Sequence, residues 1–83
     1  MVVVGYQKNS FKAENGNEIN GYNLYLGRKL NRDTDGGVGY VERVFLSDKK
    51  LAEIGYFPTV GEEVEVLYEM RFGKPRVASI RAI

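Results

Sequence analysis

Cysteine, histidine and tryptophan are all absent from this 83-residue chain. Without cysteine it can form neither a disulfide framework nor a thiolate metal site. Without histidine it lacks the commonest general base and the commonest metal ligand. We therefore expect no metal, no cofactor and no hydrolytic triad, and we interpret the protein as a non-enzyme.

Long apolar segments are also missing. No run approaches the roughly 20 residues that a bilayer span requires, and the first residues, MVVVGYQK, lack the basic region of a signal peptide. We therefore expect a cytoplasmic protein with no membrane span. Hydrophobic residues make up 43% of the chain and charged residues 28%, which is typical of one small globular domain over residues 1–83.

Charge is nearly balanced overall but unevenly distributed. The net charge is +1. Residues 1–32 carry five cations and two acids (5 − 2 = +3), residues 33–70 carry three cations and nine acids (3 − 9 = −6), and residues 71–83 carry four cations (+4). A fold that brings both ends together would have one cationic face; the alternative is a set of charges spread over a solvated surface.

The pattern of β-branched, aromatic and turn residues predicts short strands with one helical turn or two. Asn15-Gly16 favours a two-residue hairpin turn, NRDTDGGVG (31–39) a loop, and SDKKLAEIG (47–55) a short helix with Ser47 as N-cap and Gly55 as its end. Val77 and Ile80 have opposite parity, which predicts either a β-bulge or a strand buried on both faces. The expected strands are 2–6, 10–13, 19–30, 38–46, 62–70 and 76–83.

Five or six short strands with one helix between the third and fourth predict an all-β fold. A small OB-like Greek-key barrel fits the length and strand number, and an SH3-like barrel is the alternative. Residues 62–70 alternate between an apolar face and acids, so the acids are interpreted as a wet outer face and not as catalytic pairs. In the 31–39 loop neither a calcium-binding nor a phosphate-loop spacing is complete. It could still close over a ligand.

The stretch GYNLYLGRKL (21–30) raises the main functional question, because an aromatic ring lies on its wet face. By strand alternation the core face carries Tyr22, Leu24, Leu26 and Leu30, and the other face carries Asn23, Tyr25, Gly27 and Lys29. Arg28 points to the core face by strict parity, so it joins Tyr25 only if the strand ends or bulges there.

Aromatic residues stand beside cations at three places, namely Phe11 with Lys12, Tyr25 with Lys29, and Phe72 with Lys74. Rings that stack on bases and cations that follow phosphates are the elements of single-strand binding. The alternative is that an exposed ring only pairs across the sheet. Tyr22, Phe45 and Tyr68 lie among aliphatic residues and are expected to be packed.

The order GYNLYLGRKL, glycine loop, VGYVERVFLSDKKL and VGEEVEVLYEMRFGKPRVASIRAI resembles the gene V-type single-stranded DNA-binding proteins of filamentous phages and related mobile elements. The resemblance covers roughly residues 9–83 and implies an OB-type fold, a homodimer and cooperative, sequence-tolerant binding. It places Tyr25, Arg28 and Lys29 on the central strand, and Phe72 and Lys74 at the closing hairpin turn. A helix at 47–55 departs from the family, which has mostly a loop there.

The leading hypothesis is therefore a cytoplasmic single-stranded nucleic-acid-binding protein, with DNA favoured over RNA, that acts in replication or transfer of a phage, plasmid or integrated element. One alternative is a protein-interaction module or accessory subunit that uses its acidic strand 62–69, and another is a homo-oligomer joined through edge strands. A homodimer is expected because the core is thin and the ends are apolar. The expected nucleic-acid-binding residues are Phe11, Lys12, Asn23, Tyr25, Arg28, Lys29, Phe72, Lys74 and Arg76.

Overall fold

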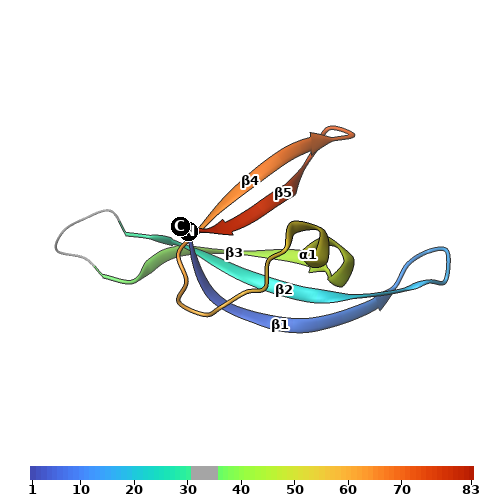
Figure 1. Cartoon of the computed structure of the whole chain (residues 1–83), viewed down its shortest axis with the longest axis horizontal. Helices are drawn as coiled ribbons and strands as arrows, with labels where there is room; N and C mark the ends of the chain where they lie inside the picture. Colours follow the sequence, from blue (N-terminus) through green and yellow to red (C-terminus); the bar gives the residue numbers. More distant parts are fainter. Residues whose placement is uncertain (31–35) are drawn as a thin grey trace.

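The computed structural model describes residues 1–30 and 36–83. Its elements in chain order are β1 (Val2–Lys12), β2 (Glu18–Lys29), β3 (Val38–Ser47), α1 (Asp48–Ile54), β4 (Val64–Arg71) and β5 (Lys74–Ala82). The first three strands form one antiparallel sheet in the order β1-β2-β3, and β4 and β5 form a second (Figure 1). The prediction of an all-β, barrel-like fold with one short helix is confirmed.

The two sheets are joined beside the chain termini, at the base of the β4–β5 hairpin (Figure 1). The Val3 N–H donates to the Glu62 carbonyl at 2.9 Å, and the Val64 N–H donates to the Met1 carbonyl at 2.7 Å. From this base the β4–β5 hairpin rises at an angle to the three-stranded sheet, on the same side as α1 (Figure 1). The outer part of the hairpin therefore faces β3 and α1 across a groove.

A small apolar core fills the angle between the sheets near this base. Leu24 and Leu26 contribute from the inner face of β2, as alternation predicts. In β5 a bulge lies at Ala78, because Leu67 pairs with Ser79 while Tyr68 pairs with Val77. The bulge turns two residues of opposite parity inward, which confirms the predicted irregularity. The buried residues are Val3, Leu24, Leu26, Leu46, Leu51, Val64, Val77 and Ile80.

The short helix forms as its end signals predict. Ser47 Oγ accepts a hydrogen bond from the Lys50 N–H at 3.1 Å, which satisfies a free donor of the first turn. Gly55 ends the helix in the left-handed region at φ 75°, and its N–H donates to the Leu51 carbonyl. Leu51 is the helix residue buried in the core. No helix within residues 1–30 and 36–83 is long and apolar enough to cross a membrane.

The first hairpin differs from the prediction in two respects. β1 is one continuous strand where two short strands, 2–6 and 10–13, were predicted, because its polar half pairs with β2 down to Lys12 and Glu18. The turn is a three-residue loop and not the predicted two-residue turn. Gly16 donates to the Ala13 carbonyl and takes φ 84°, which is typical of a tight turn followed by a left-handed residue.

Three residues assigned to the core face by alternation are exposed. Leu30 follows the end of β2 and packs toward Gly39 instead. Tyr68 and Met70 lie on the outer half of the hairpin. Tyr68 reaches β3 through its hydroxyl, which donates to Glu42 Oε1 at 2.7 Å, and the residue remains 48% exposed. Alternation correctly gives the face of a strand, but burial also requires a partner opposite that face. The predicted loop 31–39 lies partly outside the described residues.

Candidate nucleic-acid interface

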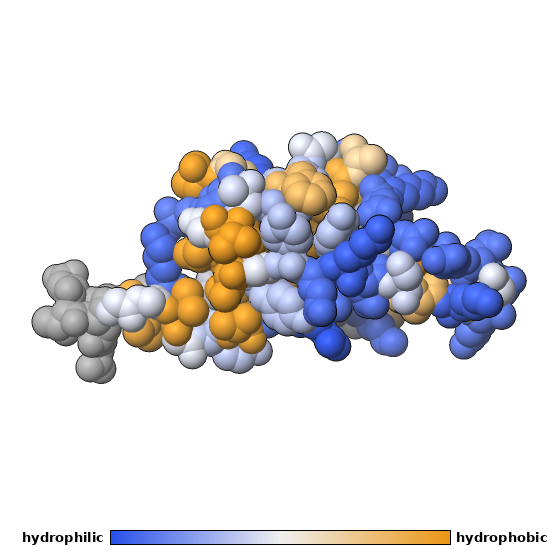
Figure 2. Space-filling model, turned by 90° about the horizontal axis from the view of Figure 1, so that it is seen from below, coloured by the Kyte–Doolittle hydropathy of each residue, from blue (hydrophilic) through white to orange (hydrophobic). Residues whose placement is uncertain are grey.

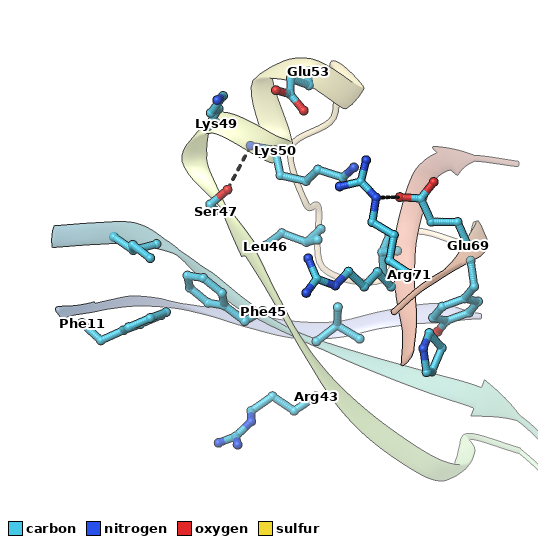
Figure 3. A pocket seen from close by; sticks show the side chains of 16 residues that line it. Phe11, Arg43, Phe45, Leu46, Ser47, Lys49, Lys50, Glu53, Glu69 and Arg71 are labelled. Carbon is cyan, nitrogen blue, oxygen red and sulfur yellow. Dashed lines mark hydrogen bonds and ion pairs between the residues drawn. The ribbon is translucent and has the colours of Figure 1, made fainter. Parts of the chain in front are cut away.

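A groove of about 820 Å³ lies between β3 and α1 on one side and the β4–β5 hairpin on the other (Figure 3). The three-stranded sheet contributes Phe11 from β1 and Phe45 from β3. The remaining walls come from α1 and from residues on both sides of the hairpin turn. Residues distant in sequence therefore share one concave surface.

Two phenylalanine rings form the apolar part of the groove. The ring centroids of Phe11 and Phe45 lie 5.2 Å apart at an interplanar angle of 60°, which is edge-to-face packing. Gly21 creates the space for this pair, because a Cβ at that position would lie 2.8 Å from the Phe45 ring. Phe11 remains 45% exposed. The rings therefore support each other and still offer aromatic surface to a ligand.

Cations outnumber carboxylates in the groove. Five cations and two carboxylates, Glu53 and Glu69, line it, which gives a net charge of 5 − 2 = +3. Within the described part of the chain, only one of the five lies within ion-pair distance of a carboxylate, where Arg71 Nε is 3.8 Å from Glu69 Oε1. The cations are Arg43, Lys49, Lys50, Arg71 and Arg76.

Part of the negative charge of residues 33–70 is compensated by cations from the two end segments. Glu63 forms an ion pair with Lys29 at 2.9 Å, and Glu65 forms one with Arg81 at 2.7 Å. The ammonium group of Lys29 holds the pKa of the Glu63 carboxyl below its usual range. Two acids of this segment are therefore paired with cations from outside it, and three of the five groove cations come from the segment itself.

Tyr25 and Asn23 lie on the outer face of β2, as predicted. Tyr25 is half-buried, and its hydroxyl donates to Gln7 Oε1 at 3.4 Å. Across the β2–β3 ladder Tyr25 pairs with Arg43, and Asn23 pairs with Phe45. The cation beside the Tyr25 backbone is thus Arg43, which also lines the groove. This register connects the predicted stacking face to the groove.

Lys29 and Arg28 lie apart from that face. Lys29 is bound to Glu63 at the base of β4. Arg28 and Lys29 line a second cavity, of about 550 Å³, together with Tyr68 and Glu63. The predicted pairing of Lys29 with Tyr25 is not seen, because β2 ends where β4 begins and the carboxylate there attracts the lysine. Arg28 remains on the core-face side, as strict alternation predicts.

The hairpin turn holds Phe72 in an unusual position. Phe72 and Gly73 form a two-residue turn with φ values of 50° and 74°, and the Phe72 residue is 94% exposed. Lys74 follows the turn and pairs with Arg71. Arg76 lines the groove, whereas Lys12 lies exposed at the end of β1 opposite Glu18. Phe11, Arg76 and the turn therefore lie in or next to the groove.

Four groove cations were not predicted, and two rings that line the groove, Phe45 and Tyr68, were expected to be packed. Phe45 was expected in the core, but it is half-buried on the outer face of β3. Its parity matches that of Arg43 in VERVF, so one register fixed between β2 and β3 would have placed both beside Asn23 and Tyr25. No local pattern connects the helix with the hairpin. The missed cations are Arg43, Lys49, Lys50 and Arg71.

The site is therefore interpreted from its own chemistry. A scan against protein families gives no match, and searches of curated proteins and of solved structures give no significant match. Within residues 1–30 and 36–83, no three acidic side chains lie close enough together to hold a metal ion. Aromatic surface beside a net positive groove suits a ligand that carries both flat rings and negative charges.

Proposed function

We propose that this protein binds single-stranded DNA with little sequence preference. The observation that supports this most strongly is the groove, which combines the Phe11–Phe45 ring pair with five cations from four separate elements. Bases can stack on exposed rings whatever their identity, and cations can follow the phosphates. The function fits replication or transfer of a phage, plasmid or integrated element in the cytoplasm, where such strands are exposed.

The alternative of a partner module with an acidic strand has less support. Of the acids on that strand, Glu63, Glu65 and Glu69 already have cationic neighbours within the chain. A basic partner would have to displace those cations to reach the carboxylates. The groove cations apart from Arg71 have no such neighbour among the described residues, so an anionic ligand is favoured.

We also propose a homodimer, because much apolar surface remains uncovered. Val4 and Val38 lie over Gly27 on the outer face of the sheet, and Leu67 and Met70 are exposed on the hairpin. Figure 2 shows hydrophobic residues gathered at one end of the face seen from below, with hydrophilic residues at the other. Light scattering should give about twice the 9.4 kDa chain mass, and a mass near 9.4 kDa at high concentration would contradict the dimer.

The experiment that tests DNA binding is a titration of labelled single-stranded oligonucleotides at low and high salt. Duplex and single-stranded RNA of the same sequence serve as competitors. Phe45→Leu keeps an apolar side chain but removes the ring, so binding should weaken by roughly 5- to 150-fold, the value of one stacked base. Arg81→Ala is the matched control, because Arg81 is bound to Glu65 and does not line the groove.

Two results would argue against the proposal. Wild-type protein that binds no single strands even at low salt, where phosphate attraction is strongest, would exclude the function. Equal affinity for duplex and single strands would show that rings do not take part. In that case binding through charge alone, as in non-specific duplex binding, would replace stacking as the explanation.

A further inference from the structure

Two cations approach the same part of the groove from opposite walls. Lys50 extends from α1 toward the hairpin, and Arg71 lies on the β4 side (Figure 3). On the β4 wall the carboxylate of Glu69 lies 3.8 Å from Arg71 Nε, on the side of Arg71 away from Lys50 (Figure 3). Lys50 has no carboxylate within ion-pair distance among the described residues.

Such an arrangement favours an anion between the walls. Like charges that face each other across a groove repel, and an anion between them converts that repulsion into attraction. Glu69 supplies this charge only partly, because 3.8 Å is a long contact and its side chain is 44% exposed. An exposed pair of this kind is weak and easily exchanged for a better acceptor. A phosphate offers several acceptor oxygens and suits the planar fork of arginine.

We propose that Lys50 and Arg71 form a phosphodiester subsite, and that Glu69 occupies Arg71 in the free protein until a phosphate of the bound strand displaces it. The inference rests on the proposed function, because the phosphate belongs to the single strand in the groove. Glu69 then lowers the affinity for every sequence alike. It also keeps the arginine oriented before the strand arrives. Binding is therefore an exchange of one anion for another.

The test compares Glu69→Gln with Glu65→Gln in titrations of single-stranded oligonucleotides at low salt. Both substitutions remove one negative charge from β4, but only Glu69 lines the groove, since Glu65 is bound to Arg81. Glu69→Gln should tighten binding by about two- to fivefold, the range that corresponds to one exposed ion pair. Glu65→Gln should change affinity by less than this.

A double-mutant cycle with Arg71→Ala makes the test specific. Arg71→Ala should weaken binding, and adding Glu69→Gln should then give no further tightening, because Glu69 has no arginine left to occupy. Lys50→Ala should weaken binding without removing the effect of Glu69→Gln. Circular dichroism confirms that each variant is folded.

Each other outcome has a definite meaning. Weaker binding by Glu69→Gln would overturn the inference, because the carboxylate would then be contacting the ligand, for example by accepting from a base amine. Equal tightening by both Gln variants would also overturn it, because only total charge would matter. Wild-type binding with no effect of Glu69→Gln refutes the subsite alone, whereas absence of wild-type binding refutes the proposed function.

Discussion

Replacing Phe72 with asparagine should make the protein more stable and a weaker DNA binder at the same time. Phe72 occupies the first position of a two-residue hairpin turn at φ 50°, a region that costs a non-glycine residue about 1 kcal/mol or more. Asn-Gly is the favoured pair in hairpin turns with two positive φ values. The ring is 94% exposed, so its removal sacrifices almost no packing.

The size of both effects follows from these observations. Relief of about 1 kcal/mol should raise the melting temperature by roughly 4–8 °C in a domain of this length. If the ring stacks on a base, its loss should weaken binding by roughly 5- to 150-fold. Thermal unfolding followed by circular dichroism measures the first change, and a single-strand titration measures the second.

Phe72→Tyr is the control for this pair of measurements, because it keeps both the ring and the unfavourable backbone conformation. Its stability and affinity should remain close to those of the wild-type protein. A lower melting temperature for Phe72→Asn would refute the stability argument, since the ring would then be making contacts in solution. Unchanged affinity would remove Phe72 from the binding site.

Other predictions concern the sheet, the hairpin and the phosphate contacts. Tyr25→Ala should weaken binding of single strands by roughly 5- to 150-fold while the protein stays folded; unfolding would assign the ring to the core. Lys74→Ala should lower affinity for all sequences and reduce the slope of log affinity against log salt by about 0.7, which a salt titration measures. Gly21→Ala should destabilise by about 1–3 kcal/mol in denaturant titrations, because its Cβ would overlap the Leu46 carbonyl oxygen of β3, whereas Gly5→Ala meets nothing within 4 Å and should be tolerated. Burial and a hydrogen bond to a β3 carboxylate raise the pKa of Tyr68 from 10.0 to about 12, so its stabilising effect is complete below pH 10 and is lost as the pH rises through 12. In a spectrophotometric titration, Tyr68→Phe should lack one of the tyrosine ionisations that the wild-type protein shows near pH 12. Loss of an ionisation near pH 10 instead would contradict the assignment.

Much of the fold was predictable because short-range patterns determine it. Ser47 and Gly55 mark the ends of the helix through hydrogen bonds made within one turn. The parity of Val77 and Ile80 predicted the β5 irregularity, and both residues are buried. These signals need no knowledge of which elements meet in space. They place strands and faces, which is why the all-β class follows from the sequence.

The candidate site was less predictable because it depends on long-range pairing. Lys29 seemed close to Tyr25 in sequence, yet its partner is Glu63, which lies 34 residues further along the chain. Arg43 was hidden in a segment of net negative charge, and only the β2–β3 register brings it opposite Tyr25. The exposure of Tyr68 and Met70 likewise depends on the angle between the β4–β5 hairpin and the three-stranded sheet. Residue type and alternation contain no information about that angle.

The attachment of the hairpin at one end has a mechanical consequence. β4 spans eight residues, so its far end lies about 26 Å from the base at 3.3 Å per residue. At its base the hairpin is held by the backbone hydrogen bonds of Val3 with Glu62 and of Val64 with Met1. A rotation of the hairpin by about 5° about this base would move its Phe72 end by roughly 2 Å. By this geometry, small repacking of the core near the termini would change the width of the groove at the opposite end, against the restraint of the hydrogen bond from Tyr68 to Glu42.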